Sequence, residues 1–352
     1  MATRQVAIDV GATVVRVAEV ELRGGDDPRA GAALTAYAER ALPAGVMREG
    51  QVEEPGAFSS AVKEALSAAK VKPKKAILAI GHPSVVVREV DVPTQSMSEV
   101  RASLAFHVQD SLPMAVDDAL LDFYPSVEIE TQSGPMLRGL LVAAPREFVR
   151  GLISGLDEAG IGPARIDHKA FALWRGTVRG ELMTSNVATV DVGAETTTVV
   201  VSQHGSPRLV RVLPQGGSDA TKAIASAFKG ASIDAEALKF QIGMNPNVGT
   251  EQRPVAEAVA HVMSPLIDSI RNTLVYFASS NPGAGAERIV LSGGGAYMAG
   301  FGQALSSATR LPVMIGDPMQ GAVVSKKVDA QQFRGREATL ATVVGLAMGG
   351  AA

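Results

Sequence analysis

The sequence feature that most constrains the fold is a short segment that occurs twice. Ala7–Ala12 (AIDVGA) recurs as Thr189–Ala194 (TVDVGA), 182 residues later in a chain of 352. Each copy ends one stretch rich in β-branched residues and precedes another, so each is predicted to be the turn between two strands. A single copy could be an ordinary hairpin turn, since Asp and Gly are common turn residues. Two copies in matching contexts half a chain apart predict a duplicated architecture.

The remaining sequence alternates between strand and helix patterns and predicts an α/β protein. A length of 352 residues exceeds what one simple core accommodates, so two or more domains are expected. Ser96 and Glu99 form a capping-box signature, and Pro265 should bend the long helix in which it lies. The predicted strands are Gln5–Val10, Val14–Leu22, Ala76–Gly81, Val85–Val92, Leu120–Ile129, Met136–Ala144, Val187–Asp191, Thr196–Gln203, Arg208–Leu213, Arg288–Leu291 and one at Val313. The predicted helices cover about 55–69, 96–112, 146–159, 217–229, 234–242, 254–279, a helix ending at Thr309, and 337–348.

Composition excludes several classes of site. The chain has no cysteine, which removes disulfides, thiolate zinc sites and cysteine nucleophiles, and its five histidines form no pair with metal-ligand spacing. A net charge of -3 with scattered basic residues gives no electrostatic footprint for nucleic acid. The dipeptide Gly-Lys never occurs, so there is no P-loop, and Met298 stands where a dinucleotide fingerprint starting at Gly293 needs its third glycine.

The N-terminus runs directly into a predicted strand and leaves no room for the apolar region of a signal peptide. No apolar run reaches the ~18 residues that a membrane-spanning helix needs. We therefore expect a soluble, cytoplasmic protein that reaches the inner face of a membrane only through partners.

The two Asp-Val-Gly-Ala turns have a specific chemistry. A turn of glycine and small residues exposes successive backbone N–H groups, which form a concave site for phosphate oxygens. Glycine permits close approach because it has no Cβ. Asp9 and Asp191 can hold a Mg²⁺ ion and its waters, because Mg²⁺ binds through few carboxylates together with substrate phosphates. Two such hairpins facing one another would clamp a triphosphate from both sides.

A third glycine-rich element fits the same picture. Arg288–Gly300 is an apolar strand, the run Gly293-Gly294-Gly295, and the start of a helix. A helix N-terminus preceded by glycine attracts anions and accepts close contact with a ligand. Taken alone, it could be an ordinary glycine-rich turn between a strand and a helix.

These three elements resemble the phosphate-1, phosphate-2 and adenosine motifs of the superfamily of actin, sugar kinases and the DnaK chaperones, and the resemblance covers nearly the whole chain. Within that superfamily the sequence is most similar to the PilM family of type IV pilus assembly proteins, with the division protein FtsA as a cousin. The resemblance implies an actin-like, ribonuclease H-like duplicated fold that binds ATP and Mg²⁺. The stretches similar to PilM in order and spacing include Asp91–Pro93, Leu121–Tyr124, Leu141–Pro145, Arg211–Gly217, Asp234–Lys239 and Ser269–Phe277.

The resemblance also implies which residues contact the nucleotide. Asp9 and Asp191 would hold Mg²⁺ through water. The phosphates would be contacted from one side by Gly11, Ala12, Thr13 and Arg16, and from the other by Gly193, Ala194, Glu195 and Thr196. The ribose and adenosine would be contacted by Gly216, Gly217, Glu236, Lys239, Gly293, Gly294, Gly295 and Tyr297. Glu236 and Lys239 lie one helical turn apart, so a solvated ion pair on a helix surface is the alternative interpretation.

An FtsA-type division into subdomains is implied as well. Subdomain 1A would comprise residues 1–81, 162–185 and 336–352. An inserted subdomain 1C at 82–161 would bind a partner. Subdomain 2A would comprise 186–222 and 286–335, and subdomain 2B 223–285.

The chain departs from the family pattern at one position, and two residues are candidates for the catalytic position. Arg16 stands where relatives carry lysine, which keeps the charge but presents a wider planar group. The residue that orients the attacking water would lie at Asp167 or His168, and helix capping is the favoured interpretation of Asp167. We therefore expect hydrolysis to be slow or absent, with ATP stabilising a closed cleft.

Three function classes remain. By resemblance, an adaptor would bind the N-terminal cytoplasmic peptide of the membrane protein PilN in a groove of 1A and 1C, with the pilus motor ATPase, a platform protein or a second copy as further candidate partners. An FtsA-like filament protein would end in a basic amphipathic helix, which Gly345–Ala352 does not resemble. A small-molecule kinase would need a general base in a polar loop facing the γ-phosphate, and residues 82–161 show none.

Overall fold

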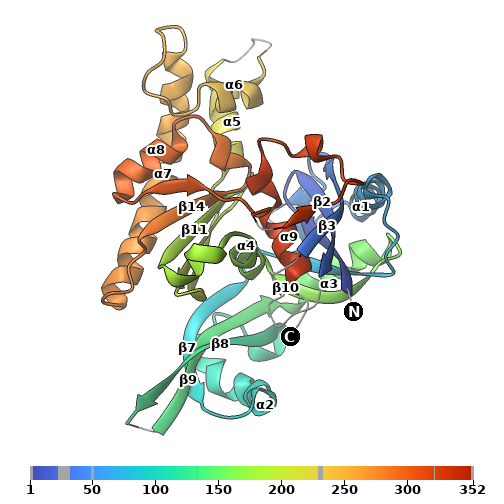
Figure 1. Cartoon of the computed structure of the whole chain (residues 1–352), viewed down its shortest axis with the longest axis vertical. Coiled ribbons are helices and arrows are strands. Elements are labelled where there is room, and N and C mark those ends of the chain that lie inside the picture. Colours follow the sequence, from blue (N-terminus) through green and yellow to red (C-terminus); the bar gives the residue numbers. More distant parts are fainter. Residues whose placement is uncertain are drawn as a thin grey trace.

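The computed structural model describes residues 3–22, 32–48, 51–132, 134–228, 233–320 and 322–349. Two mixed sheets lie side by side, with a smaller three-stranded sheet at one end of the molecule (Figure 1). Gly24–Pro28, which the sequence predicts to be a polar surface loop, lies outside the described part, as does Gly50, which belongs to a stretch similar to the PilM family.

Five strands of each large sheet follow the same order. The first sheet has the order β10-β6-β1-β2-β3-β16, and the second, given from the corresponding edge, has the order β15-β14-β11-β12-β13. Strand β16 is an additional edge strand of the first sheet. In each, an antiparallel hairpin (β1/β2 or β11/β12) is followed by strands parallel to its first member. The duplication predicted from the repeated turn is therefore present in the topology. The strands are β1 (Thr3–Val10), β2 (Val14–Leu22), β3 (Ala32–Ala41), β6 (Lys75–Ile80), β10 (Gly162–His168), β16 (Val323–Val324), β11 (Val187–Val192), β12 (Thr197–Gln203), β13 (Ser206–Leu213), β14 (Arg288–Ser292) and β15 (Val313–Ile315).

Each sheet is covered on both faces because successive strand residues point to opposite sides. On β1, Ile8 faces the core under α1 (Pro55–Ala69), whereas Ala7 faces α9 (Ala341–Met348). The second sheet packs α4 (Lys169–Thr177) on one face. Its other face packs α5 (Gly217–Ala227), α7 (Arg253–Ser280) and α8 (Phe301–Thr309).

Helices α4 and α9 join the two halves. They cross between the two sheets (Figure 1), and glycines stand at the crossing. A Cβ added to Gly345 of α9 would lie 1.8 Å from the carbonyl oxygen of Ala172 in α4. One added to Gly176 of α4 would lie 2.1 Å from the carbonyl oxygen of Ala341. The close approach of the two backbones therefore depends on glycine at both positions.

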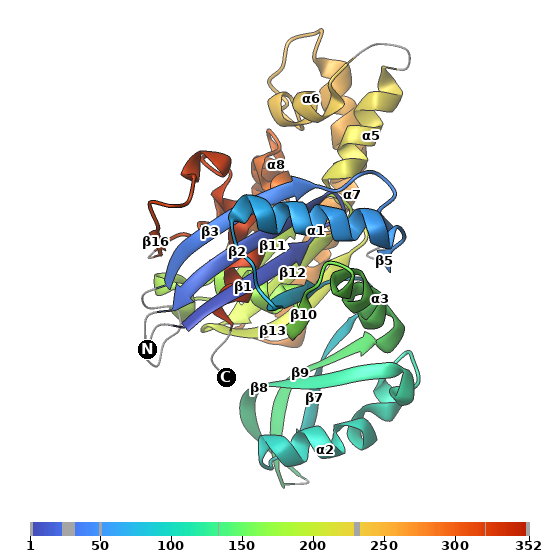
Figure 2. The same cartoon turned by 90° about the vertical axis from the view of Figure 1, so that its right-hand side faces the viewer.

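The three-stranded sheet lies at the end of the molecule opposite α5 and α6 (Ala235–Gln241), as Figure 2 shows. Its order is β7-β9-β8, with β7 at Val86–Pro93, β8 at Ala119–Thr131 and β9 at Gly134–Pro145. Helix α2 (Met97–Val108) packs Val100, Leu104 and Val108 on it. Helix α3 (Arg146–Asp157), which follows β9, packs with α1 under the first sheet. The predicted subdomain boundaries stay a prediction.

Most helices and strands predicted from local sequence signals are present in the structure. The capping box of Ser96 and Glu99 is confirmed. Helix α7 continues through Pro265, and the bend there stays a prediction. The final helix was predicted to start at Glu337, but residues Glu337–Leu340 form a 3-10 turn before α9. Strand β3 was not predicted at all.

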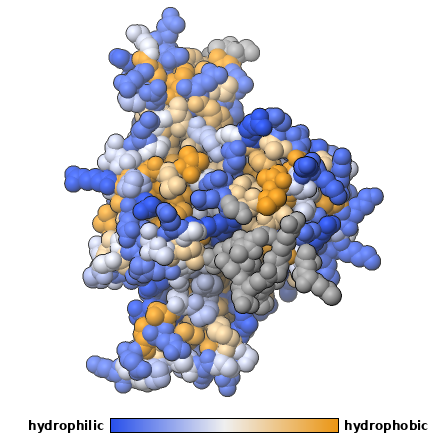
Figure 3. Space-filling model, in the orientation of Figure 1, coloured by the Kyte–Doolittle hydropathy of each residue, from blue (hydrophilic) through white to orange (hydrophobic). Residues whose placement is uncertain are grey.

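Hydrophobic and hydrophilic residues alternate over the face drawn in Figure 3. Large exposed apolar side chains are scattered, with Phe106 on α2, Tyr276 on α7 and Met314 on β15 as examples. Among the described helices, none is both long and apolar enough to cross a lipid bilayer.

Candidate functional site

A cleft of about 660 Å³ lies between the two large sheets. Both predicted phosphate hairpins and the glycine run after β14 open into it. Of the residues predicted to bind nucleotide or metal, all line this cleft except Gly216. Asp167 does not line it either. The structure thus brings together at one place predicted residues from five separate segments of the sequence.

The two hairpins have the same local geometry. The amide of Gly11 donates to the carbonyl of Val14 at 2.8 Å, and that of Gly193 to Thr196 at 2.9 Å. These bonds close each turn tightly. The turn amides at Ala12 and Ala194 donate to no other described group. Each hairpin can therefore offer backbone N–H groups to an anion, and the phosphate contacts expected there stay a prediction.

Asp9 and Asp191 are the last residues but one of β1 and β11, the first strands of the two hairpins, and both line the cleft. Their side chains are only 2% and 8% exposed. Lys169, the first residue of α4, places its Nζ 3.3 Å from Asp9 Oδ1, yet that oxygen accepts no hydrogen bond. Burial raises the pKa of Asp191; the charge of Asp9 adds to this effect and that of Lys169 opposes it. Two buried carboxylates near one another favour a bound cation.

The N-terminus of α5 is attached to the second hairpin. The amides of Gly217 and Ser218 donate to the carbonyls of Gly193 and Ala194, both at 2.8 Å. A Cβ on Gly216 would lie 2.5 Å from the carbonyl oxygen of Ala194. Gly216 therefore packs behind the hairpin, and it is Gly217 that lines the cleft.

Glu236 and Lys239 of α6 form an ion pair in which Lys239 is buried and Glu236 is 57% exposed. The Lys239 side chain is 6% exposed, and its Nζ donates to Glu236 Oε1 at 2.7 Å, Thr221 Oγ1 at 3.0 Å and the carbonyl of Gly217 at 3.4 Å. The same Nζ lies 4.7 Å from the centre of the Phe240 ring. The surface-pair alternative is thus wrong for Lys239, which links α6 to the start of α5.

The glycine run after β14 requires glycine at its first position. Gly293 has φ +79°, and a Cβ there would lie 2.5 Å from the carbonyl oxygen of Val192 and 2.9 Å from Asp191 Oδ1. Residues Gly294–Tyr297 then form a 3-10 turn. The Tyr297 hydroxyl accepts a hydrogen bond from the amide of Ala338 at 3.1 Å, so Tyr297 both lines the cleft and holds the segment before α9.

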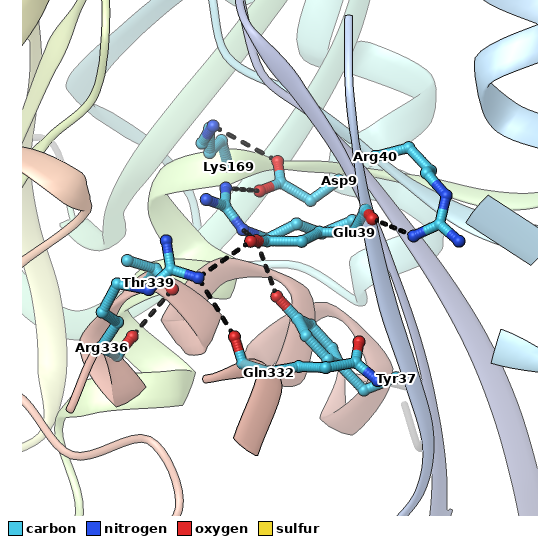
Figure 4. Close-up of polar contacts among 9 residues, drawn as sticks. Asp9, Tyr37, Glu39, Arg40, Lys169, Gln332, Arg336 and Thr339 are labelled. Atoms are coloured by element: carbon cyan, nitrogen blue, oxygen red, sulfur yellow. Dashed lines mark hydrogen bonds and ion pairs between the residues drawn. The ribbon is translucent and has the colours of Figure 1, made fainter. Parts of the chain in front are cut away.

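Arg16 belongs to a cluster of charged side chains on the first sheet, and Figure 4 labels its neighbours Asp9 and Glu39. Its Nε donates to Glu39 Oε2 at 3.2 Å, and its Nη1 lies 4.0 Å from Asp9 Oδ2. Glu39, on β3, also accepts from the Tyr37 hydroxyl at 3.0 Å and from Arg336 Nη2 at 3.2 Å. Glu39 and Arg336 line the cleft, and no sequence motif predicted either of them.

The interpretation of Asp167 as a helix cap is wrong. The Asp167 carboxylate pairs with Arg175 of α4 outside the cleft lining. The cap is His168, whose Nδ1 accepts a hydrogen bond from the amide of Ala170 at 3.1 Å. The catalytic role suggested for Asp167 stays a prediction.

The His168 cap should make stability depend on pH. Burial lowers the pKa of His168 to about 4, whereas an unperturbed histidine titrates near pH 6.5. Between these values the unfolded chain binds more protons than the folded one, so up to about 3 kcal/mol of stability is lost as pH falls through this window. His168→Asn keeps a capping oxygen and should remove most of that loss.

Urea unfolding at about pH 7.5 and about pH 5 measures the effect. The matched control is His107→Asn on the exposed face of α2, which should retain the wild-type pH dependence. A His168→Asn protein that loses as much stability as wild type on acidification would contradict the prediction.

A second cavity of about 510 Å³ adjoins the first and shares Gly11, Ala12, Lys169, Glu195 and Thr196 with it. Its far wall is apolar and comes from the end of β6 and the loop after it, from α3, and from Met47. The Phe148 ring of α3 stacks on His82, with centroids 5.4 Å apart and planes at 27°. The residues of this wall are Met47, Ala79, Ile80, Pro83, Phe148 and Leu152.

The donor set of the first cleft suits a polyphosphate with a divalent cation. Two hairpins present amides from opposite sides, and Asp9 Oδ1 is buried without a hydrogen bond. Among the described residues, no group of three or more His, Asp or Glu could hold a metal ion alone. Mg²⁺ does not need one, because it retains waters and binds phosphate oxygens beside one or two carboxylates.

The chain is similar in sequence and in structure to several known proteins. The family described as "Type IV pilus assembly protein PilM" matches residues 7–351. A chain of the solved "PilM-PilN type IV pilus biogenesis complex" is 28% identical and superposes with a TM-score of 0.83, covering 98% of this chain and 97% of that one. MreB 5 of Spiroplasma citri bound to AMPPNP shares the fold at 12% identity, with a TM-score of 0.53 and coverage of 97% and 94%.

Curated relatives are cell division proteins. FtsA of Streptococcus pneumoniae is 25% identical over 260 residues, which are 67% of this chain and 55% of FtsA. FtsA of Bacillus subtilis is 28% identical over 107 residues, or 30% of this chain and 24% of FtsA. The chain thus spans between about a quarter and just over half of these relatives. Together with the strand order, these similarities confirm the predicted actin-like α/β fold.

Proposed function

The chain belongs to the PilM family of type IV pilus assembly proteins, and from this premise we propose that it is an ATP-binding adaptor on the cytoplasmic side of the pilus machine. In this role the first cleft binds Mg·ATP, and a separate surface binds the N-terminal peptide of a PilN-like membrane protein. Similarity to a chain of a PilM–PilN complex over nearly its whole length supports the partner.

The feature that supports nucleotide binding most directly is the pair of facing hairpins. The amides at Ala12 and Ala194 would donate to phosphate oxygens, and Asp9 and Asp191 would orient the waters of Mg²⁺. The metal would neutralise phosphate charge when bound. Lys239, Phe240 and Tyr297 line the nucleoside end of the cleft. Because Asp167 lies outside the lining, the geometry supports ATP as a structural ligand better than rapid hydrolysis.

The second cavity is our proposed peptide site. Its apolar wall can accommodate aliphatic side chains, while Arg48, Lys222 and Asp219 offer polar contacts near it. The cavity lies where α3, which follows the three-stranded sheet, meets the first sheet. A peptide bound there would contact the same hairpin residues that line the nucleotide cleft, including Ala12 and Thr196.

Calorimetric titration with the N-terminal peptide of the same organism's PilN, in the presence of Mg·ATP, tests the proposal. We expect stoichiometric binding that a scrambled peptide of equal charge does not reproduce. Phe148→Ala should weaken binding roughly tenfold, because truncating an aromatic anchor removes buried contact area. Phe106→Ala, at a ring that is 74% exposed on α2, is the matched control and should bind as wild type does.

Titrations of these two variants distinguish between the ways in which the proposal could fail. Retained ATP binding by Phe148→Ala would show that the variant is folded. Equal peptide affinity for both variants would overturn the cavity assignment. No peptide binding by wild-type protein that still binds ATP would favour an FtsA-like filament role instead.

A further inference from the structure

Four cationic side chains line the nucleotide cleft, and one of them differs from the others in its surroundings. The side chains of Lys239, Arg16 and Lys169 are 6%, 17% and 21% exposed, and each lies beside a carboxylate. The side chain of Arg336 is 56% exposed and pairs with Glu39 at the cleft edge; it also donates to the carbonyl of Gln332, four residues earlier in the same segment, at 3.1 Å. An exposed ion pair of this kind contributes little to stability, so Arg336 can leave it at small cost.

Glu39 is held more firmly than Arg336. Its Oε2 accepts hydrogen bonds from Arg16 Nε and from the hydroxyl of Tyr37, which is buried. Burial raises the pKa of Tyr37, so the hydroxyl remains protonated and remains a donor. Only Oε1 is left for Arg336 (Figure 4). If Arg336 moved, Glu39 would keep two of its three partners.

The segment that carries Arg336 connects the two halves of the molecule. Arg336 reaches the first sheet through Glu39, whereas Ala338, two residues later, is bound to the second half. The Ala338 amide donates to the Tyr297 hydroxyl at 3.1 Å, and its carbonyl accepts from Ser292 Oγ at 2.8 Å. This segment leads directly into α9, which crosses α4.

We propose that Arg336 is an anion-binding residue of the cleft whose guanidinium is paired with Glu39 until an anion binds. This proposal rests on the proposed nucleotide function: the phosphate chain of the bound nucleotide competes with Glu39 for the Arg336 guanidinium. A phosphate offers stronger charge-assisted hydrogen bonds than the single contact with Glu39. The transfer would also change how the segment before α9 is attached to the first sheet.

Removing the charge of Arg336 and removing the charge of Glu39 should change the ATP affinity in opposite directions. Arg336→Gln loses a phosphate contact and should weaken ATP binding about five- to tenfold. Glu39→Gln removes the competing charge and should strengthen ATP binding by roughly threefold or more. Neither change should alter the affinity for adenosine, which has no phosphate.

The experiment is calorimetric titration of the full chain with ATP and with adenosine, at low and high salt. The matched control pair is Arg4→Gln and Glu21→Gln, which break a surface ion pair of 3.1 Å on β1 and β2; both should bind ATP as wild type does. Arg336→Lys should retain part of the ATP preference. Circular dichroism confirms that each variant is folded.

The outcomes separate the inference from the function on which it rests. Wild-type protein that binds no ATP would overturn the proposed function. Wild-type protein that binds ATP with the same affinity as Arg336→Gln would overturn the inference alone. Weakening of ATP binding by both Glu39→Gln and Arg336→Gln would also overturn it, because it would make the ion pair merely structural.

Discussion

Replacing Gly345 with alanine is expected to lower the free energy of unfolding by about 3 kcal/mol, because overpacking at a close backbone crossing cannot be relieved by a rotamer change. The added Cβ would lie 1.8 Å from the carbonyl oxygen of Ala172 and 2.8 Å from the amide nitrogen of Gly176. Both are backbone atoms, so α4 and α9 would have to separate. Urea unfolding measures the change, with the fluorescence of Trp174, the only tryptophan of the chain, as a reporter on α4 itself.

Gly151→Ala is the matched control for this substitution. Gly151 also lies in a helix, on the exposed side of α3, and a Cβ there would meet no atom within 4 Å. We expect this variant to be as stable as wild type or more stable by about 0.5–1 kcal/mol, since alanine is the better helix former. A Gly345→Ala protein as stable as Gly151→Ala would contradict the crossing. Because α4 packs on the second sheet and α9 on the first, such a crossing also fixes how the two halves lie about the cleft.

The sequence predicted the duplicated fold because its evidence was local and repeated. Each Asp-Val-Gly-Ala turn lies between β-branched runs, and those runs pair as hairpins by their own register. Strand β3 was missed for the opposite reason. Its sequence, AALTAYAERA, is half alanine, which is uncommon in strands, and only its burial between the sheet's two helical layers makes it one. Tertiary packing, which no local pattern records, decided this element.

The cleft shows the same division between local and distant information. Its glycine turns could be predicted because the residues that determine their backbone conformation are consecutive in the sequence. Glu39, Lys169 and Arg336 could not, because each reaches the cleft from a segment with no motif of its own. The sequence makes His168 a candidate catalytic residue, whereas in the structure it is a helix cap. This role can be recognised only once the start of α4 is known. Isolated charged residues therefore acquire their roles from the strand order, not from their neighbours in sequence.

Asp191→Asn is expected to remove most of the effect of Mg²⁺ on ATP binding. A carboxylate that orients metal-bound waters typically contributes about 10- to 100-fold to metal affinity, and an amide cannot replace its charge. We expect wild-type protein to bind ATP at least about tenfold more tightly with Mg²⁺ than with EDTA, and the variant to show little difference. Glu19→Gln on β2, on the first sheet outside the cleft lining, is a control that should retain the full Mg²⁺ effect.

Without ligand, Asp191→Asn should raise the free energy of unfolding, although the same substitution weakens the effect of Mg²⁺ on ATP binding. Burial raises the pKa of Asp191, which means that folding penalises its charged form. Stability from such a group is present below its unfolded pKa and is lost as pH rises through the higher folded pKa. At neutral pH without Mg²⁺ or nucleotide, Asp191→Asn should therefore unfold at a higher urea concentration than wild type, and Mg·ATP should reverse that order. A variant that is less stable than wild type in both conditions would show that Asp191 supports the fold and does not serve a bound cation.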